Sequence, residues 1–182
     1  MTYLLQNVRL FEAFSEKERA DLLHFMHEKR YASGETICSR GERGDTMIVV
    51  AQGALSAVVP GSDNLPREIA HLAQGEVFGE MFCLDPAPRP ATVVACEPTV
   101  VLEFGREDLV RLRQNAPRAA AALVSAVFHN VLRRLRNVDD RIGRDLRVGD
   151  DSRPDGNELP RSSRTDVPSP WEVCFARLRG SA

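Results

Sequence analysis

The sequence predicts a mainly β fold with flanking helices: a jelly-roll-like β barrel with N-terminal helices and a long C-terminal helix. Two observations indicate this class. First, about eight short β-rich segments between residues 29 and 104 are separated by turns rich in glycine, proline and asparagine. Second, helical patterns stand on both sides of this region. Short, regularly punctuated strands are typical of antiparallel barrels and sandwiches.

The composition is that of an ordinary globular protein. The chain has 182 residues, 43% of them hydrophobic and 27% charged, which suits one domain with a substantial core. A formal net charge of −2 gives no basic footprint, so we expect no nucleic-acid partner. No apolar run approaches the ~18 residues of a membrane helix, so we expect a cytoplasmic protein without a membrane partner. No C-x-x-C spacing occurs, so we expect the four cysteines to be reduced and to pack as small apolar side chains: Cys38, Cys83, Cys96 and Cys174.

The N-terminal part begins with a short amphipathic piece at residues 8–14. Ser15 then opens a helix, and Glu18 three residues later completes a capping-box pattern. His24 and His27 are spaced i, i+3. No third ligand is evident nearby, so we expect solvated histidines on the helix surface and no metal site.

From Arg30 the pattern changes to a period of two. The predicted strands cover residues 29–32, 36–39, 46–51, 54–59, 68–72, 76–78, 91–95 and 100–104. Turn signals separate them, and several of the turn glycines are expected at positive φ.

The C-terminal part predicts two helices. The first starts at residues 105–108 and stops before Pro117, which suits the first position of a second helix running to about residue 146. Its apolar residues follow a heptad spacing: Val124, Phe128, Val131, Leu135, Val138 and Ile142. This stripe either packs on the barrel of its own chain or joins two subunits in a homodimer, and we expect the homodimer.

We expect one domain over residues 1–147. Residues 148–182 are rich in Ser, Pro, Asp, Arg and Gly and predict a disordered tail. A short apolar island at residues 171–178 either docks on the barrel or a partner or has no function.

The chemistry concentrates in residues 75–93, which read GEVFGEMFCLDPAPRPATV. Glu80 and Arg89 are held across a loop entered through Gly79. A carboxylate accepts hydrogen bonds from sugar hydroxyls, and a guanidinium matches phosphate oxygens. The first residues of a short helix would add backbone N–H groups. The residues expected to bind a ligand are Phe78, Gly79, Glu80, Met81, Phe82, Arg89, Pro90 and Ala91.

This stretch resembles the phosphate-binding cassette of the cyclic nucleotide-binding domain family, which includes the catabolite-activator-like effector domains. The family pattern is Phe-Gly-Glu-Leu-Ala-Leu, a short spacer and Arg-Ala-Ala-Thr-Val, and the resemblance covers roughly residues 8–135. It implies that Glu80 accepts the ribose 2′-hydroxyl, that Arg89 pairs with the cyclic phosphate and that Gly79 lets the backbone approach. In proteins resembling the bacterial catabolite activator, the long helix forms the dimer interface and closes over the nucleotide.

Two residues depart from the family pattern. Pro90 has no backbone N–H to offer a phosphate, and the loss of one charge-assisted donor costs ~1.5–3 kcal/mol. Phe82 replaces a small residue, and its ring either points into the core or crowds the phosphate. Family members that favour cGMP often carry a Thr after the arginine, so Pro90 favours cAMP.

The expected function is a cAMP-binding regulatory module that transmits ligand binding through its C-terminal helix. One alternative is a ligand-free interaction or dimerisation module with a degenerate pocket. Another is a transcription regulator of the catabolite-activator type that lacks its helix-turn-helix domain, since only the polar tail follows the long helix. The sequence has no G-x-S-x-G motif of serine hydrolases, no H-E-x-x-H motif of zinc hydrolases, and no glycine-rich motif of P-loop or dinucleotide-binding proteins. We therefore expect that the protein is not an enzyme.

Overall fold

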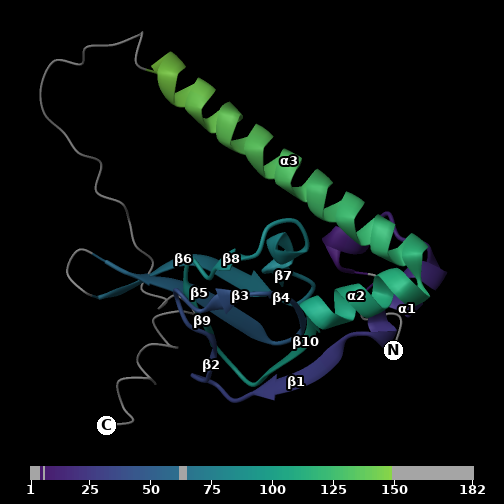
Figure 1. Ribbon diagram of the computed structural model, residues 1–182. Helices are drawn as coiled ribbons and strands as arrows, with labels where there is room; N and C mark the ends of the chain where they lie inside the picture. Colours follow the sequence, from purple (N-terminus) through teal and green to yellow (C-terminus); the bar gives the residue numbers. More distant parts are fainter. Residues whose placement is uncertain (1–4, 6, 62–64, 149–182) are drawn as a thin grey trace, which may run out of the picture. The chain divides into compact units, whose positions relative to one another are not determined.

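The computed structural model describes residues 5, 7–61 and 65–148, and in residues 134–148 only the backbone. These residues contain short 3₁₀ segments, three α-helices and ten strands (Figure 1). In chain order the elements are η2 (Arg9–Phe11), α1 (Glu16–His24), β1 (His27–Tyr31), β2 (Thr36–Cys38), β3 (Arg43–Gly44), β4 (Thr46–Gln52), β5 (Ala54–Pro60), β6 (Pro66–Ala73), β7 (Val77–Phe78), η3 (Glu80–Cys83), β8 (Ala87–Pro88), β9 (Thr92–Ala95), β10 (Thr99–Gly105), α2 (Arg106–Asn115) and α3 (Pro117–Val148).

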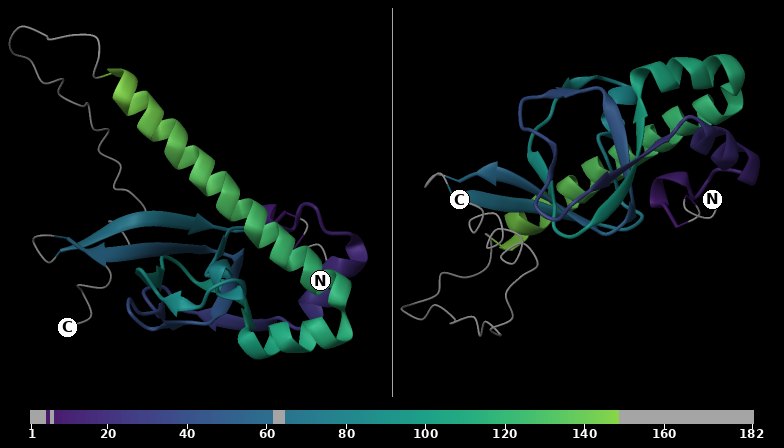
Figure 2. Two further views of the ribbon diagram at one scale, coloured as in Figure 1. Left: turned by 45° about the horizontal axis from the view of Figure 1, so that its top comes forward. Right: turned by 90° about the horizontal axis from the view of Figure 1, so that it is seen from below.

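The strands form two antiparallel four-stranded sheets and one small ribbon. The sheet orders are β1-β10-β4-β7 and β2-β9-β5-β6, and β3 pairs with β8. The right-hand view of Figure 2 shows the strands curving around a common interior. This arrangement confirms the predicted jelly-roll-like barrel with flanking helices.

Strand β4 separates two hydrophobic clusters because successive side chains point to opposite faces of a sheet. Ile48 and Val50 face the barrel interior, where they pack with residues of β5, β9 and β10. Met47 and Val49 face the helices and join a cluster with residues of η2, α1, α2 and α3. Burial on both faces explains why β4 reads as a continuous apolar run.

Helix α1 begins as the sequence predicts. The backbone N–H of Glu18 donates to the Ser15 hydroxyl, and the Glu18 carboxylate accepts from the backbone N–H of Ser15 at 2.8 Å. The hydrogen bonds that this carboxylate accepts from the backbone N–H and from the hydroxyl of Ser15 lower the pKa of Glu18. The helix ends at His24, so the prediction that His27 lies on this helix was wrong. His27 is the first residue of β1, because the chain turns at residues 25 and 26 and the strand begins two residues earlier than predicted.

The β3–β8 ribbon was not predicted. It pairs Arg43 with Pro88 and Gly44 with Ala87, in a segment whose glycines and prolines read as turns. Its consequence is that residues 87–90 are tied to the loop before β4.

Helix α3 begins at Pro117, as predicted. Residues up to Val127 belong to one compact unit of the chain, and Phe128 begins a second. Within the first unit, the buried face of α3 consists of Ala119, Ala120, Leu123 and Val127. The predicted heptad stripe starts on a neighbouring face, at the half-buried Val124.

Candidate functional site

The predicted ligand loop connects β7 to β9. Strand β7 ends at Phe78, and Gly79 adopts the left-handed conformation with φ 73° and ψ 7° before η3 begins. Glu80, the first residue of η3, is only 2% exposed. Since a buried carboxylate needs polar partners, Glu80 is placed to accept hydrogen bonds in a nearly solvent-free environment.

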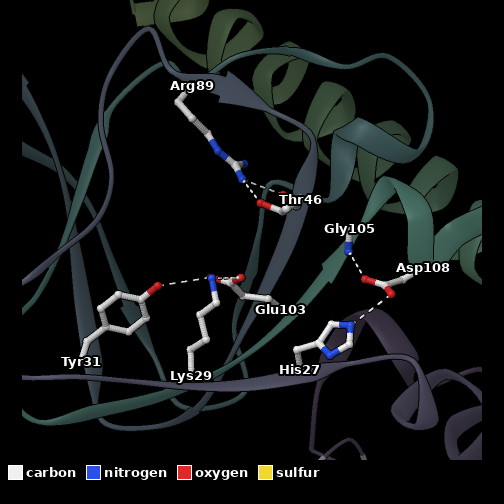
Figure 3. Close-up of polar contacts among 8 residues, drawn as sticks. All are labelled: His27, Lys29, Tyr31, Thr46, Arg89, Glu103, Gly105 and Asp108. Atoms are coloured by element: carbon white, nitrogen blue, oxygen red, sulfur yellow. Dashed lines mark hydrogen bonds and ion pairs between the residues drawn. The ribbon is translucent and has the colours of Figure 1, made fainter.

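Arg89 is held through its backbone and through its side chain. Its N–H donates to the carbonyl of Glu42 at 2.8 Å, and its own carbonyl accepts from Gly41 at 2.8 Å. Its Nη2 donates to the carbonyl of Thr46 at 2.7 Å and to the Thr46 hydroxyl at 2.6 Å (Figure 3). The guanidinium carbon lies 5.6 Å from the ring centroid of Phe78, within cation–π distance.

The Arg89 side chain is 7% exposed, and its Nε has no hydrogen-bond partner. Most buried polar groups are hydrogen-bonded, and a buried charge is costly unless it is paired. An unpartnered N–H on a buried cation therefore favours an anionic ligand at this position.

Two glycines let the backbone approach Arg89. A Cβ on Gly79 would collide with Nη1 of Arg89 and would lie 2.5 Å from the carbonyl oxygen of Thr46. A Cβ on Gly44 would meet the carbonyl oxygen of Ala87 and lie 3.4 Å from Cδ of Arg89. The loop that carries Glu80 and strand β3 thus both pack closely against the arginine.

The remaining predicted site residues divide into two groups. Phe82 is 4% exposed and its ring centroid lies 6.3 Å from that of Phe104, so the ring belongs to the helical core cluster. Ala91 is buried, next to β9. Met81 and Pro90 are exposed. The question that the sequence left open for Phe82 therefore has an answer: the ring points into the core.

Two buried thiols lie near the loop. Burial, followed by the negative charge of Glu80, raises the pKa of Cys83 to about 12. The pKa of Cys38 is also raised, because the effect of burial is larger than the opposing effect of the positive charge of Arg89. Both thiols therefore stay protonated at neutral pH, consistent with packing roles.

Two polar clusters lie outside the loop (Figure 3). Glu103 of β10 pairs with Lys29 at 2.6 Å and accepts from the Tyr31 hydroxyl at 3.2 Å. Asp108 of α2 accepts from the backbone N–H of Gly105 at 2.9 Å and contacts Nε2 of His27 at 3.1 Å. Across the part of the chain that the structure describes, no group of three His, Cys, Asp or Glu residues could hold a metal ion.

The heptad stripe on α3 is described in part. Val124 and Val131 are half-buried and Phe128 is 52% exposed. The side chains of Leu135, Val138 and Ile142 lie outside the described residues. Residues 149–182, with the predicted disordered tail and its apolar island, also lie outside them.

Sequence reasoning missed Thr46 and Gly44. Both precede the apolar run of β4 in the motif Gly44-Asp45-Thr46. A polar residue at the start of a strand buried on both faces was the available signal, but only the fold shows that it contacts Arg89, 43 residues away.

Comparisons with known proteins identify the family that this chain is similar to. A family model described as the cyclic nucleotide-binding domain matches residues 28–116. The chain is 32% identical over 130 residues to the cyclic AMP receptor protein of Thermus thermophilus, covering 71% of this chain and 58% of that protein. It is 29% identical over 128 residues to a cGMP-dependent protein kinase of Eimeria tenella, covering 70% of this chain and 12% of the kinase. The chain thus spans less than two thirds of either relative.

A solved structure shares the fold. The N-terminal domain of a transcriptional regulator from Streptomyces coelicolor A3(2) matches with a TM-score of 0.66 and 32% identity, covering 75% of this chain and 95% of that one. Among the described residues, no helix is both long enough and apolar enough to cross a membrane.

Proposed function

Because residues 28–116 belong to the cyclic nucleotide-binding domain family, we propose that the chain is a regulatory module that binds a cyclic nucleotide without catalytic activity of its own. Arg89 pairs with the cyclic phosphate, and Glu80 accepts the ribose 2′-hydroxyl. Gly79 lets the loop backbone approach the ligand, and Phe78, Met81, Pro90 and Ala91 border it.

The main support for this proposal is the burial and the incomplete hydrogen bonding of Arg89. Its guanidinium is almost fully buried, yet its Nε has no partner. A phosphate stabilises a buried guanidinium strongly, because it can accept two parallel hydrogen bonds from the planar group. Gly79 and Gly44 let the backbone pack closely against the Arg89 side chain.

We propose cAMP as the preferred ligand. The residue after Arg89 is Pro90, which has neither a hydroxyl to bond a guanine nor a backbone N–H. The names of the relatives include both cyclic nucleotides. Calorimetric titration of the purified protein with cAMP and with cGMP tests this preference. We expect cAMP to bind more tightly, and a lower Kd for cGMP would overturn the ligand assignment.

We further propose that ligand binding is transmitted through α3, in a homodimer joined by the heptad stripe. Support comes from the two faces of α3 in the first unit. The face that meets the core is Ala119, Ala120, Leu123 and Val127. Within the first unit the stripe begins at the half-buried Val124, which is not part of that face. Phe128, which begins the second unit, is 52% exposed and is available to a second copy of the chain.

One specific residue favours the alternative of an interaction module with a degenerate pocket. Pro90 cannot donate the backbone hydrogen bond that family members supply at this position. Phe82 does not favour it, because its ring is in the core. No binding of either nucleotide in the same titration would support this alternative.

A further inference from the structure

Thr46 provides both hydrogen-bond acceptors that hold the Arg89 guanidinium. Its carbonyl and its hydroxyl accept from the same atom, Nη2, at 2.7 and 2.6 Å. Thr46 is the first residue of β4. A β-branched residue in a strand has a stiff χ1, so the hydroxyl is a fixed acceptor.

The donors of Arg89 are used unequally. Nη2 has two acceptors, Nε has none, and Nη1 lies against Gly79. The guanidinium is planar, so fixing Nη2 at one end and packing Gly44 beside Cδ sets the direction of the other N–H groups. Thr46 therefore determines where the unpartnered Nε–H points.

Thr46 also touches the start of α2. It is paired with Gly105 in the β4–β10 register, and Gly105 is the N-cap residue of α2. A Cβ on Gly105 would lie 3.7 Å from Cγ2 of Thr46. The residue that accepts from Arg89 therefore lies in a sheet strand next to the start of α2, and not in a loop.

We propose that Thr46 is a positioning residue, whose hydroxyl aims Nε and Nη1 of Arg89 at a bound phosphate group. This rests on the proposed function. The backbone carbonyl of Thr46 would hold Arg89 in any variant, whereas the hydroxyl depends on the side chain. Serine keeps the hydroxyl, and valine keeps the branched shape without it.

The test compares three variants by calorimetric titration with cAMP. Thr46→Val should raise the Kd about tenfold, the effect of one charge-assisted hydrogen bond. Thr46→Ser should stay within about twofold of the wild type. Thr99→Val is the matched control: its buried hydroxyl donates to the carbonyls of Ala54 and Glu97 and not to the Arg89 site, so its loss should leave the Kd unchanged. A wild-type Kd in Thr46→Val, or an equal loss in Thr46→Ser, would overturn the proposal.

A second measurement needs no ligand. The ¹H–¹⁵N resonance of the Arg89 Nε–H is assigned by its disappearance in Arg89→Lys. In Thr46→Val it should shift and exchange faster with water, whereas Thr46→Ser and Thr99→Val should leave it in place. If the wild type binds no nucleotide, the proposed function fails. In that case an unchanged Nε–H resonance in Thr46→Val would separately overturn the positioning role.

Discussion

The backbone of Gly79 lies directly against the guanidinium of Arg89, so closely that a Cβ at residue 79 would collide with Nη1. Gly79 also has a φ of 73°, a conformation that L-residues rarely adopt. Both the backbone conformation and the available space therefore require glycine here. The residue that follows is the buried Glu80, so the contact with the arginine is made directly before the carboxylate in the chain.

Gly79→Ala should lower both stability and ligand affinity. A left-handed alanine costs roughly 1–2 kcal/mol by itself, and the carbonyl of Thr46, 2.5 Å from the new Cβ, belongs to a strand that cannot move freely. We expect a loss of more than about 2 kcal/mol in the free energy of unfolding in urea, and at least about tenfold weaker cAMP binding.

Gly41→Ala is the matched control for this change. Gly41 has a φ of 83°, and no atom lies within 4 Å of the position that a Cβ would take there. It should therefore show the conformational cost of roughly 1–2 kcal/mol without the collision. Equal losses in the two variants would contradict the contact between Gly79 and Arg89.

Phe82→Leu should weaken the core without improving the site. Because the ring packs near Phe104, we expect the free energy of unfolding to fall by about 1 kcal/mol and the cAMP affinity not to rise. Phe14→Leu, at an equally buried ring in the same cluster, should cost a similar amount and leave affinity unchanged. Tighter cAMP binding by Phe82→Leu would mean that the ring crowds the ligand.

Tyr31 should give the protein a sensitivity to alkaline pH. Burial, followed by the charge of Glu103, raises the pKa of Tyr31 to about 12, above the ~10 of an unfolded tyrosine. A pKa raised by folding gives stability that is complete below about pH 10 and is lost as the pH rises towards 12.

Tyr31→Phe should therefore flatten the fall in stability between about pH 10 and 12. Urea unfolding midpoints at several pH values measure this, and ultraviolet absorbance follows the ionisation of the tyrosine. Parallel stability curves for wild type and variant would rule out the raised pKa.

Phe128→Glu should separate the proposed dimer. A carboxylate on the heptad stripe would have to be buried between two copies of the helix, which is strongly unfavourable. Sedimentation velocity should show a dimer for the wild type and a monomer for the variant. His129→Glu places the same charge on the neighbouring exposed position and should remain dimeric. A wild-type monomer at micromolar concentration would contradict the interface.

The sequence was sufficient for the elements whose signals are local. The capping box of Ser15 and Glu18, the start of α3 at Pro117 and the loop around Gly79 all follow from neighbouring residues. The contact between Thr46 and Arg89 could not be predicted, because Thr46 begins β4 whereas Arg89 lies in the loop between β8 and β9, 43 residues away, and the two meet only in the folded chain. His27 was placed on a helix because its spacing from His24 suits one, whereas its contact with Asp108 spans 81 residues. The β3–β8 ribbon was not predicted, because two of its four residues are a glycine and a proline, which are typical of turns.

Titration of the wild type and of Arg89→Ala with cAMP tests the central claim most directly. We expect the wild type to bind with a Kd of about 1 μM or lower, and Arg89→Ala to bind at least ~100-fold more weakly, because the buried guanidinium is the main phosphate partner. Circular dichroism would verify that the variant is folded. Binding of equal strength by the two proteins, or no binding by the wild type, would contradict a working nucleotide site built on Arg89.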